Sequence, residues 1–483
     1  MARRRLACGL ALLASSICWS HGRAEERPNI LLAMADDWGW PHAGAYGDPV
    51  VQTPTFDRLA REGVLFRNAF VAAPSCTPSR NAVLTGEWHW RLGQGGNLWS
   101  TLHPKYPTYP KLLARAGYYV GHSQKAWGPG NWRYLGRKED PVGARYEDFA
   151  QFFRQRPRDK PFCFWLGTSD PHRPYRFGSG TESGIDLAKV KPPADLPGHD
   201  TVRSDVADYY FEVQRFDKDV GAALALLEAT DELENTIVVM TGDHGMPFPR
   251  HKCNLYDSGT HVCLAIRWGA KIKPGRLVTD FVSLIDLAPT FLEVAGAVKP
   301  AHMIGRSLLP ILSAEGSGRI DASRDYVLTG RERHVPAQEK PSIVGYPSRA
   351  FRTDRYLYIR NFHPERWPAG APLNSTFGRL YADCDESPTK TFLLEHRDHP
   401  QYRKYFKLAF AKRPAEELYD LESDPDQLEN IADQSRFAAL KAQLSHQLRE
   451  ALRRAGDPRI AGNANAFDRY PYRPGLRGEL IRQ

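Results

Sequence analysis

The stretch Cys76-Thr77-Pro78-Ser79-Arg80 decides the fold and the chemistry of this chain of 483 residues. A Cys-x-Pro-x-Arg pentapeptide is a modest signal when it stands alone. Here it lies about 40 residues after an apolar run that ends in Asp36-Asp37. It also lies far before a second apolar run that ends in Gly242-Asp243-His244-Gly245. The combination predicts one chemical site built from distant parts of the chain.

Four short apolar runs predict strands that are buried on both faces, as in a parallel sheet covered by helices. They are residues 30–34, 118–120, 162–166 and 236–240. Helical patterns lie between them, at residues 55–62, 109–116 and 206–229. This alternation predicts an α/β fold with a large, mostly parallel sheet between layers of helices. After about residue 345 the pattern changes to paired strands and one amphipathic helix, which predicts a small C-terminal α+β domain.

Polar residues follow each of the four predicted strands. They are Asp36-Asp37, Gln124-Lys125, Asp170-Pro171-His172 and Asp243-His244. Ligands in such sheets bind beyond the carboxyl ends of the strands, so we expect these side chains to meet at one edge. Three carboxylates crowded together need a cation, and hard oxygen ligands favour calcium or magnesium.

These motifs together resemble those of the type I sulfatases, and most of all the heparan N-sulfatases (sulfamidases). The resemblance covers roughly residues 27 to 455 and includes the segments Gly305-Arg306-Ser307-Leu308-Leu309-Pro310 and Glu417-Leu418-Tyr419-Asp420-Leu421. It implies an alkaline-phosphatase-like sulfatase fold. We expect a catalytic domain over residues 25–345 and the smaller domain over residues 346–483.

The resemblance also implies that Cys76 is oxidised to formylglycine by a formylglycine-generating enzyme. The aldehyde is hydrated to a gem-diol, one hydroxyl attacks sulfur, and the second lets the sulfated adduct collapse back to the aldehyde. Arg80 would steady the modified residue. One Ca²⁺, with Mg²⁺ less favoured, is implied at five ligand positions: Asp36, Asp37, Cys76, Asp243 and His244. Relatives often have Asn where this chain has His244, whose imidazole is a softer ligand than an amide oxygen.

Three further positions match catalytic residues of the family. Lys125, His172 and Lys252 would form a cationic clamp that stabilises charge on the transferring sulfuryl group, and His172 could protonate the leaving atom. Trp127 stands where many sulfatases carry the histidine assigned to sulfate release. The base for that step stays open between His122, His251 and water.

The segments Asp170-Pro171-His172-Arg173 and Met246-Pro247-Phe248-Pro249 are most similar to those of sulfamidases. We therefore expect hydrolysis of the N-sulfate of glucosamine in heparan-type glycans. Three alternatives remain. They are an O-sulfatase acting on sugar or aryl sulfates, a phosphodiesterase or phosphonate hydrolase of the same superfamily, and a non-catalytic binder of sulfated glycans.

Residues 1–24 are expected to be a signal peptide, because three arginines at positions 3–5 precede a short apolar run and then small residues. The protein would then be exported to the periplasm, a lysosome or the medium, with no stable membrane insertion. Removal of residues 1–24 takes away four arginines and lowers the net charge from +9 to +5. A mildly basic surface suits an acidic substrate, although a merely solvated surface explains it equally well. No pattern indicates nucleic-acid binding, and the oligomeric state, a homodimer included, stays open.

The chain has seven cysteines, of which two lie in the predicted signal peptide and Cys76 belongs to the motif. Cys163, Cys253, Cys263 and Cys384 remain. In an oxidising compartment Cys253 and Cys263 could form a disulfide, and buried free thiols are the alternative.

Overall fold

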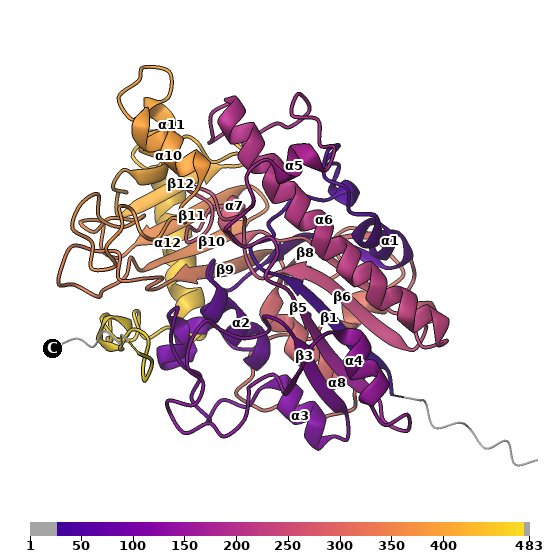
Figure 1. Ribbon diagram of the computed structural model, residues 1–483. Coiled ribbons are helices and arrows are strands. Elements are labelled where there is room, and N and C mark those ends of the chain that lie inside the picture. Colours follow the sequence, from indigo (N-terminus) through magenta and orange to yellow (C-terminus); the bar gives the residue numbers. More distant parts are fainter. Residues whose placement is uncertain (1–26, 478–483) are drawn as a thin grey trace, which may run out of the picture.

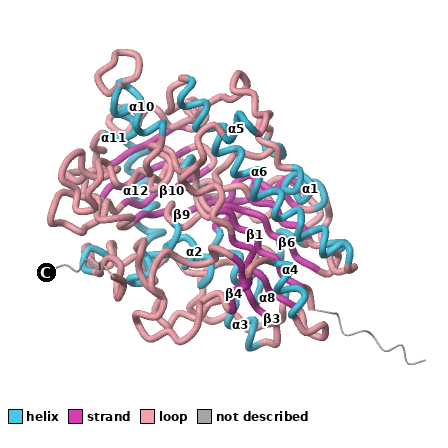
Figure 2. The backbone as a smooth tube through the Cα atoms, viewed as in Figure 1, coloured by secondary structure: helices cyan, strands magenta, loops and turns pink. Residues whose placement is uncertain are grey.

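The computed structural model describes residues 27–477, so the predicted signal peptide lies outside the described part of the chain. A large sheet and a small sheet stand next to each other, and the C-terminal half of the chain supplies the small one (Figure 1). Long loops run between the two sheets (Figure 2).

The large sheet has eight strands in the order β4-β3-β5-β1-β6-β7-β2-β8. All neighbours pair in parallel except β7, which is antiparallel to both β6 and β2. The strand bounds are β1 Asn29–Ala35, β2 Val64–Phe70, β3 Tyr119–Ser123, β4 Ala144–Tyr146, β5 Phe162–Gly167, β6 Thr236–Gly242, β7 Leu264–Arg267 and β8 Arg276–Ser283. The predicted α/β fold is confirmed, and the four predicted strands are β1, β3, β5 and β6.

Both faces of the large sheet are covered, which explains why its central strands are apolar without alternation. On β1, Leu31 and Ala33 pack with α1, α4 and α6 on one face, while Ile30 and Leu32 pack with α2, α3 and α8 on the other. The helix bounds are α1 Pro54–Glu62, α2 Cys76–Thr85, α3 Tyr109–Arg115, α4 Phe149–Gln155, α5 Ser179–Glu182, α6 Asp200–Ala229, α7 Asp257–Thr260, α8 Leu287–Val294 and α9 Leu309–Leu312.

The small sheet is antiparallel, in the order β12-β11-β10-β9. Its bounds and those of the last helices are β9 Tyr326–Arg331, β10 Ser348–Thr353, β11 Tyr356–Asn361, α10 Pro388–Glu395, α11 Arg403–Phe410, β12 Glu416–Asp420 and α12 Ala438–Arg454. One face packs on α12, as predicted from its apolar stripe, and the other contacts Leu255 and Tyr256 of the large domain. The strand β9 belongs to the small sheet although it precedes residue 345, where the second domain was expected to begin. The boundary between the two domains stays a prediction.

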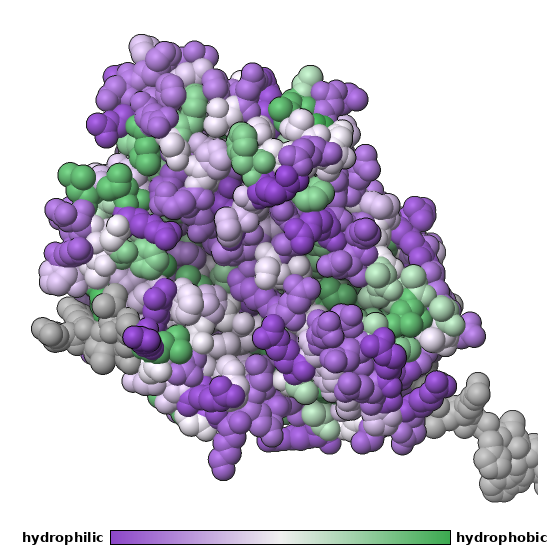
Figure 3. Space-filling view, viewed as in Figure 1, coloured by the Kyte–Doolittle hydropathy of each residue, from purple (hydrophilic) through white to green (hydrophobic). Residues whose placement is uncertain are grey.

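None of the described helices is long and apolar enough to cross a membrane. The face in Figure 3 is largely hydrophilic, and its apolar residues form small, separate patches. The five cysteines of the described residues are buried free thiols, so the alternative to a Cys253–Cys263 disulfide is the one observed.

Candidate active site

The acidic edge of the site is set by the register of β1 and β6. These strands run in parallel with Ala35 opposite Gly242, so the residues after them lie side by side. The backbone N–H of Asp37 donates to Oδ1 of Asp243 at 2.9 Å, and all three predicted carboxylates are buried. A side chain at Gly242 would come within 2.0 Å of the Trp38 carbonyl oxygen, which explains the glycine at this close approach.

Cys76 is the first residue of α2 and points into this cluster. Its Sγ lies 3.4 Å from Asp36 Oδ1 and 3.4 Å from His244 Nε2. Burial and the charge of Asp36 raise the pKa of the Cys76 thiol well above its ordinary value. One turn later the Arg80 guanidinium is fully buried, with Nε 2.8 Å from Asp243 Oδ2 and Nη1 donating to the Lys125 carbonyl at 2.6 Å. Arg80 therefore ties α2 to the ends of β6 and β3.

Two lysines bring positive charge to the same edge. Lys125 forms an ion pair with Asp36. Lys252 Nζ lies 2.8 Å from Asp37 Oδ2, and also 3.0 Å from Oδ2 of Asp385. Burial alone would lower the pKa of Lys252, but the two carboxylates raise it well above its ordinary value. The amine is therefore held as a buried cation beside Cys76.

The carboxylate oxygens of this edge are the ligand type that a hard divalent cation prefers, and residue 76 would add an oxygen if it is formylglycine. Atoms of Asp36, Cys76, Asp243 and His244 lie within 4.8 Å of one another, and those of Asp37, Cys76 and His172 form a second such group. Oδ1 of Asp37 is buried and receives no hydrogen bond from the described residues, although His244 Nε2 lies 3.2 Å away. A buried carboxylate oxygen that receives no hydrogen bond is able to coordinate a metal ion.

Above Cys76 opens a cavity of about 640 Å³. Its walls include all three predicted cationic residues, Lys125, His172 and Lys252, together with Trp127. The geometry thus brings every predicted site residue to one edge of the sheet. Their catalytic and metal-binding roles stay predictions.

Several residues that the sequence did not indicate also line the cavity, among them His334 and Asp385. His334 Nδ1 lies 2.8 Å from the Ser75 hydroxyl oxygen, and burial and nearby Lys252 lower the pKa of His334 well below its ordinary value. Neither His122 nor His251, which were considered as bases, is among the lining residues. His122 Nε2 instead lies 3.8 Å from a carboxylate oxygen of Asp140.

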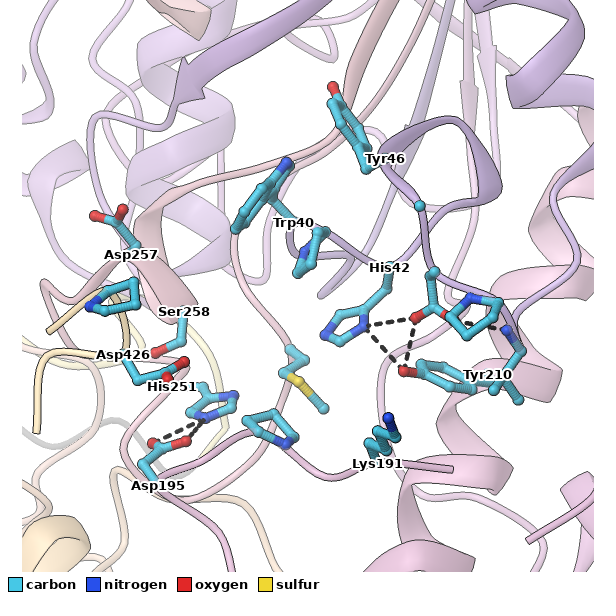
Figure 4. Close-up of a pocket in the computed structure, with 18 of the residues that line it drawn as sticks. Trp40, His42, Tyr46, Lys191, Asp195, Tyr210, His251, Asp257, Ser258 and Asp426 are labelled. Atoms are coloured by element: carbon cyan, nitrogen blue, oxygen red, sulfur yellow. Dashed lines mark hydrogen bonds and ion pairs between the residues drawn. The ribbon is translucent and has the colours of Figure 1, made fainter. Parts of the chain in front are cut away.

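His251 belongs to a second cavity of about 450 Å³ (Figure 4). There its Nε2 lies 3.0 Å from Asp195, and the Tyr210 hydroxyl donates to Asp48 at 2.8 Å. The loop that carries Lys252 into the first cavity therefore turns the preceding side chain into the second one. His251 stands outside the predicted chemistry.

Comparison with known proteins gives matches along nearly the whole chain. The Sulfatase family model matches residues 28–297, and the model "N-sulphoglucosamine sulphohydrolase, C-terminal" matches residues 242–365. Human N-sulphoglucosamine sulphohydrolase is 31% identical, with 94% of each chain covered. An ulvan-active sulfatase of Formosa agariphila is 27% identical over 89% of this chain and 81% of its own. A solved structure in complex with its substrate D-glucosamine-2-N,6-O-disulfate superposes with a TM-score of 0.62 at 22% identity, over 89% of this chain and 99% of that one.

Proposed function

The chain belongs to the sulfatase family, the hydrolases of sulfuric esters and sulfamides, and we propose that its substrate is the N-sulfate of glucosamine in heparan-type glycans. The observation that carries the proposal is the cavity lined by Cys76, Lys125, His172 and Lys252, with the buried carboxylates of Asp36, Asp37 and Asp243 grouped around Cys76. The relationship to a sulphohydrolase of N-sulphoglucosamine along 94% of both chains favours nitrogen as the leaving atom.

In this proposal Cys76 is converted to formylglycine by a formylglycine-generating enzyme, and its hydrate supplies the attacking oxygen. Asp36, Asp37, Asp243 and His244, with residue 76, would hold Ca²⁺. The ion would supply Lewis-acid chemistry by offsetting negative charge at the reacting group. Arg80 keeps this edge assembled through its bond to Asp243.

The remaining steps fall to side chains of the cavity. The ammonium groups of Lys125 and Lys252 bind the sulfuryl oxygens, whose negative charge grows as the bond to the leaving atom breaks. His172 gives a proton to the departing nitrogen, and its ring is oriented by the 2.5 Å contact between Nδ1 and the Arg173 carbonyl oxygen. Trp127 lines the cavity and donates from its indole nitrogen to Asn81 Oδ1 at 2.7 Å, so this side chain is fixed as a wall.

The test uses protein produced together with a formylglycine-generating enzyme, with conversion of Cys76 verified by peptide mass. The protein is incubated with glucosamine N-sulfate, and the free amine is measured. We expect amine release that is lost in Cys76→Ala. Verified formylglycine protein that releases no amine would rule out the N-sulfate as substrate, and release of sulfate from 6-O-, 2-O- or aryl sulfates would then identify an O-sulfatase.

A further inference from the structure

Asp385 is an acidic residue in a cavity that should bind an anion. It lies in the loop between β11 and α10, and its side chain keeps about a quarter of its surface exposed. Within residues 27–477 the hydrogen bond found for its carboxylate uses Oδ2, which accepts from Lys252 at 3.0 Å. Oδ1 is therefore available to a ligand.

A carboxylate at this position needs a reason, because a fixed negative charge repels a sulfate group. Burial alone would raise the pKa of Asp385, but Lys252, His172 and His334 hold it below its ordinary value, so the group stays ionised. An ionised carboxylate only accepts hydrogen bonds. The oxygens of a sulfuryl group are also acceptors, so a substrate donor to Asp385, beyond the bond from Lys252, would come from another part of the substrate.

The leaving atom offers such a partner when it is nitrogen. A sulfamate nitrogen carries a hydrogen, and the released amine becomes an ammonium group at neutral pH. The bridging oxygen of a sulfate ester carries no hydrogen until it leaves as an alcohol. A site built to accept a hydrogen bond discriminates against a substrate that lacks the donor, because its own polar group is then left unpaired.

The structure holds Asp385 firmly relative to His172. Asp383, two residues earlier, accepts from Arg331 at 2.8 Å and from the Val335 backbone N–H at 3.0 Å. On the other side of Asp385, the Thr389 hydroxyl donates at 2.6 Å to Asp205.

Asp205 in turn accepts from both terminal nitrogens of Arg173, the residue after His172, at 2.8 and 2.9 Å. The two chain segments that carry His172 and Asp385 are thus linked by buried polar contacts between Arg173, Asp205 and Thr389. Such pre-organisation is what selective recognition of a leaving group requires.

We propose that Asp385 accepts a hydrogen bond from the leaving nitrogen and is the residue by which this site prefers an amine to an alcohol as leaving group. The inference rests on the proposed function. In the step, the S–N bond breaks and its electron pair stays on nitrogen, which takes a proton from His172. Sulfur forms its new bond to the deprotonated hydroxyl oxygen of the hydrated formylglycine at position 76, whose proton has gone to solvent, and the amine is left against Asp385.

Inhibition by the two reaction products, glucosamine and sulfate, distinguishes a direct contact of Asp385 with the amine from an effect of Asp385 on Lys252 alone. Inhibition by glucosamine and by inorganic sulfate is measured for the wild type, Asp385→Asn and Asp385→Glu, each checked for unchanged thermal unfolding. Asp398→Asn is the control, because that side chain is 91% exposed in the same half of the chain. In Asp385→Asn we expect inhibition by glucosamine to weaken about 10-fold or more and inhibition by sulfate to change less than about 3-fold, since a charge-assisted hydrogen bond is lost at the amine alone. Asp385→Glu should recover part of the difference.

Parallel loss of inhibition by both products would overturn the proposal, since Asp385 would then act only through Lys252. Failure of glucosamine to bind the wild type would overturn it as well. Direct calorimetric titration of glucosamine needs no turnover, so Asp385 is tested even if the wild type releases no amine from glucosamine N-sulfate. A wild type that binds glucosamine but releases no amine from glucosamine N-sulfate would contradict the proposed function and leave the recognition of an amine by Asp385 intact.

Discussion

Asp205→Ala should destabilise the protein strongly and impair turnover, although Asp205 touches neither Cys76 nor the carboxylate cluster. Asp205 lies on α6 and is 1% exposed. Its carboxylate accepts from Arg173 at 2.8 and 2.9 Å and from the Thr389 hydroxyl at 2.6 Å. The substitution leaves the Arg173 guanidinium, whose side chain is 5% exposed, without its counter-charge.

The expected cost in the free energy of unfolding is about 3–5 kcal/mol, the range for removing one partner of a buried ion pair. We expect the lower end of that range, because Arg173 keeps a 2.9 Å hydrogen bond to the Pro247 carbonyl and lies 4.4 and 4.5 Å from the ring centres of Tyr175 and Phe248. Asp200→Ala on the same helix is the matched control. Asp200 also pairs with an arginine, at 2.7 Å, but is 88% exposed, so its loss should cost no more than about 1 kcal/mol.

Denaturant unfolding of both variants, followed by tryptophan fluorescence, gives the comparison, and amine release reports on the site. A second test adds Arg173→Met to Asp205→Ala. This double variant should be more stable than Asp205→Ala alone, because no unpaired charge remains buried. The reasoning is refuted if Asp205→Ala is no less stable than Asp200→Ala. It is also refuted if the double variant loses as much free energy of unfolding as Asp205→Ala and Arg173→Met lose together when each is made alone.

Four further outcomes are expected. Lys252→Ala should lower kcat/KM by about 10²–10³-fold, through loss of charge stabilisation at the sulfuryl group, and a loss below about 10-fold in steady-state assays would contradict that role. His172→Ala should lower amine release by about 10²–10⁴-fold, with a smaller effect on an aryl sulfate whose leaving group needs no proton, and near-normal turnover would remove its assignment as acid. Chelation should lower the thermal midpoint, and Ca²⁺ at about 100 times its Kd should return about 2.7 kcal/mol of stability, whereas a midpoint indifferent to Ca²⁺ speaks against the metal site. Burial alone would raise the pKa of Glu332, but Arg459 and Arg349 lower it from 4.5 to about 2, so its contribution to stability is complete above pH 4.5 and is lost as the pH falls toward 2. Glu332→Gln should therefore destabilise the protein at pH 7 and make stability depend less on pH between 4.5 and 2. An acid-unfolding profile identical to that of the wild type would contradict this role.

The fold and the acidic half of the site could be predicted because short stretches of sequence there indicate the strands and the residues that follow them. Apolar runs without alternation marked the central strands, and the parallel-sheet rule then placed Asp36 beside Asp243. The pairing of Ala35 with Gly242 is the register that makes this rule hold in this chain.

Asp385 and His334 could not be found in the same way. Asp385-Glu386 precedes Ser387-Pro388, and in sequence it has the features of solvent-exposed acids before a helix start. Asp385 is placed in the site by its ion pair with Lys252, which is 133 positions away in the sequence. The small sheet packs on Leu255 and Tyr256, and this packing brings the two parts of the chain together. The residues next to Asp385 in the sequence carry no signal for such a contact, because the partner of this acidic pair lies far away along the chain.

Asp385 comes from the C-terminal half of the chain, so the two tasks proposed for the site lie on separate segments. In the proposed mechanism the edge formed by β1, α2 and β6 binds the sulfuryl group, whether sulfur is bonded to nitrogen or to oxygen in the substrate. The loop before α10 would face the departing group, and Lys252 joins it to the edge of the large sheet by pairing with both Asp385 and Asp37. Replacing this loop alone would offer a direct route to redesigning which sulfated compounds the protein accepts, with the strand-end machinery left as it stands.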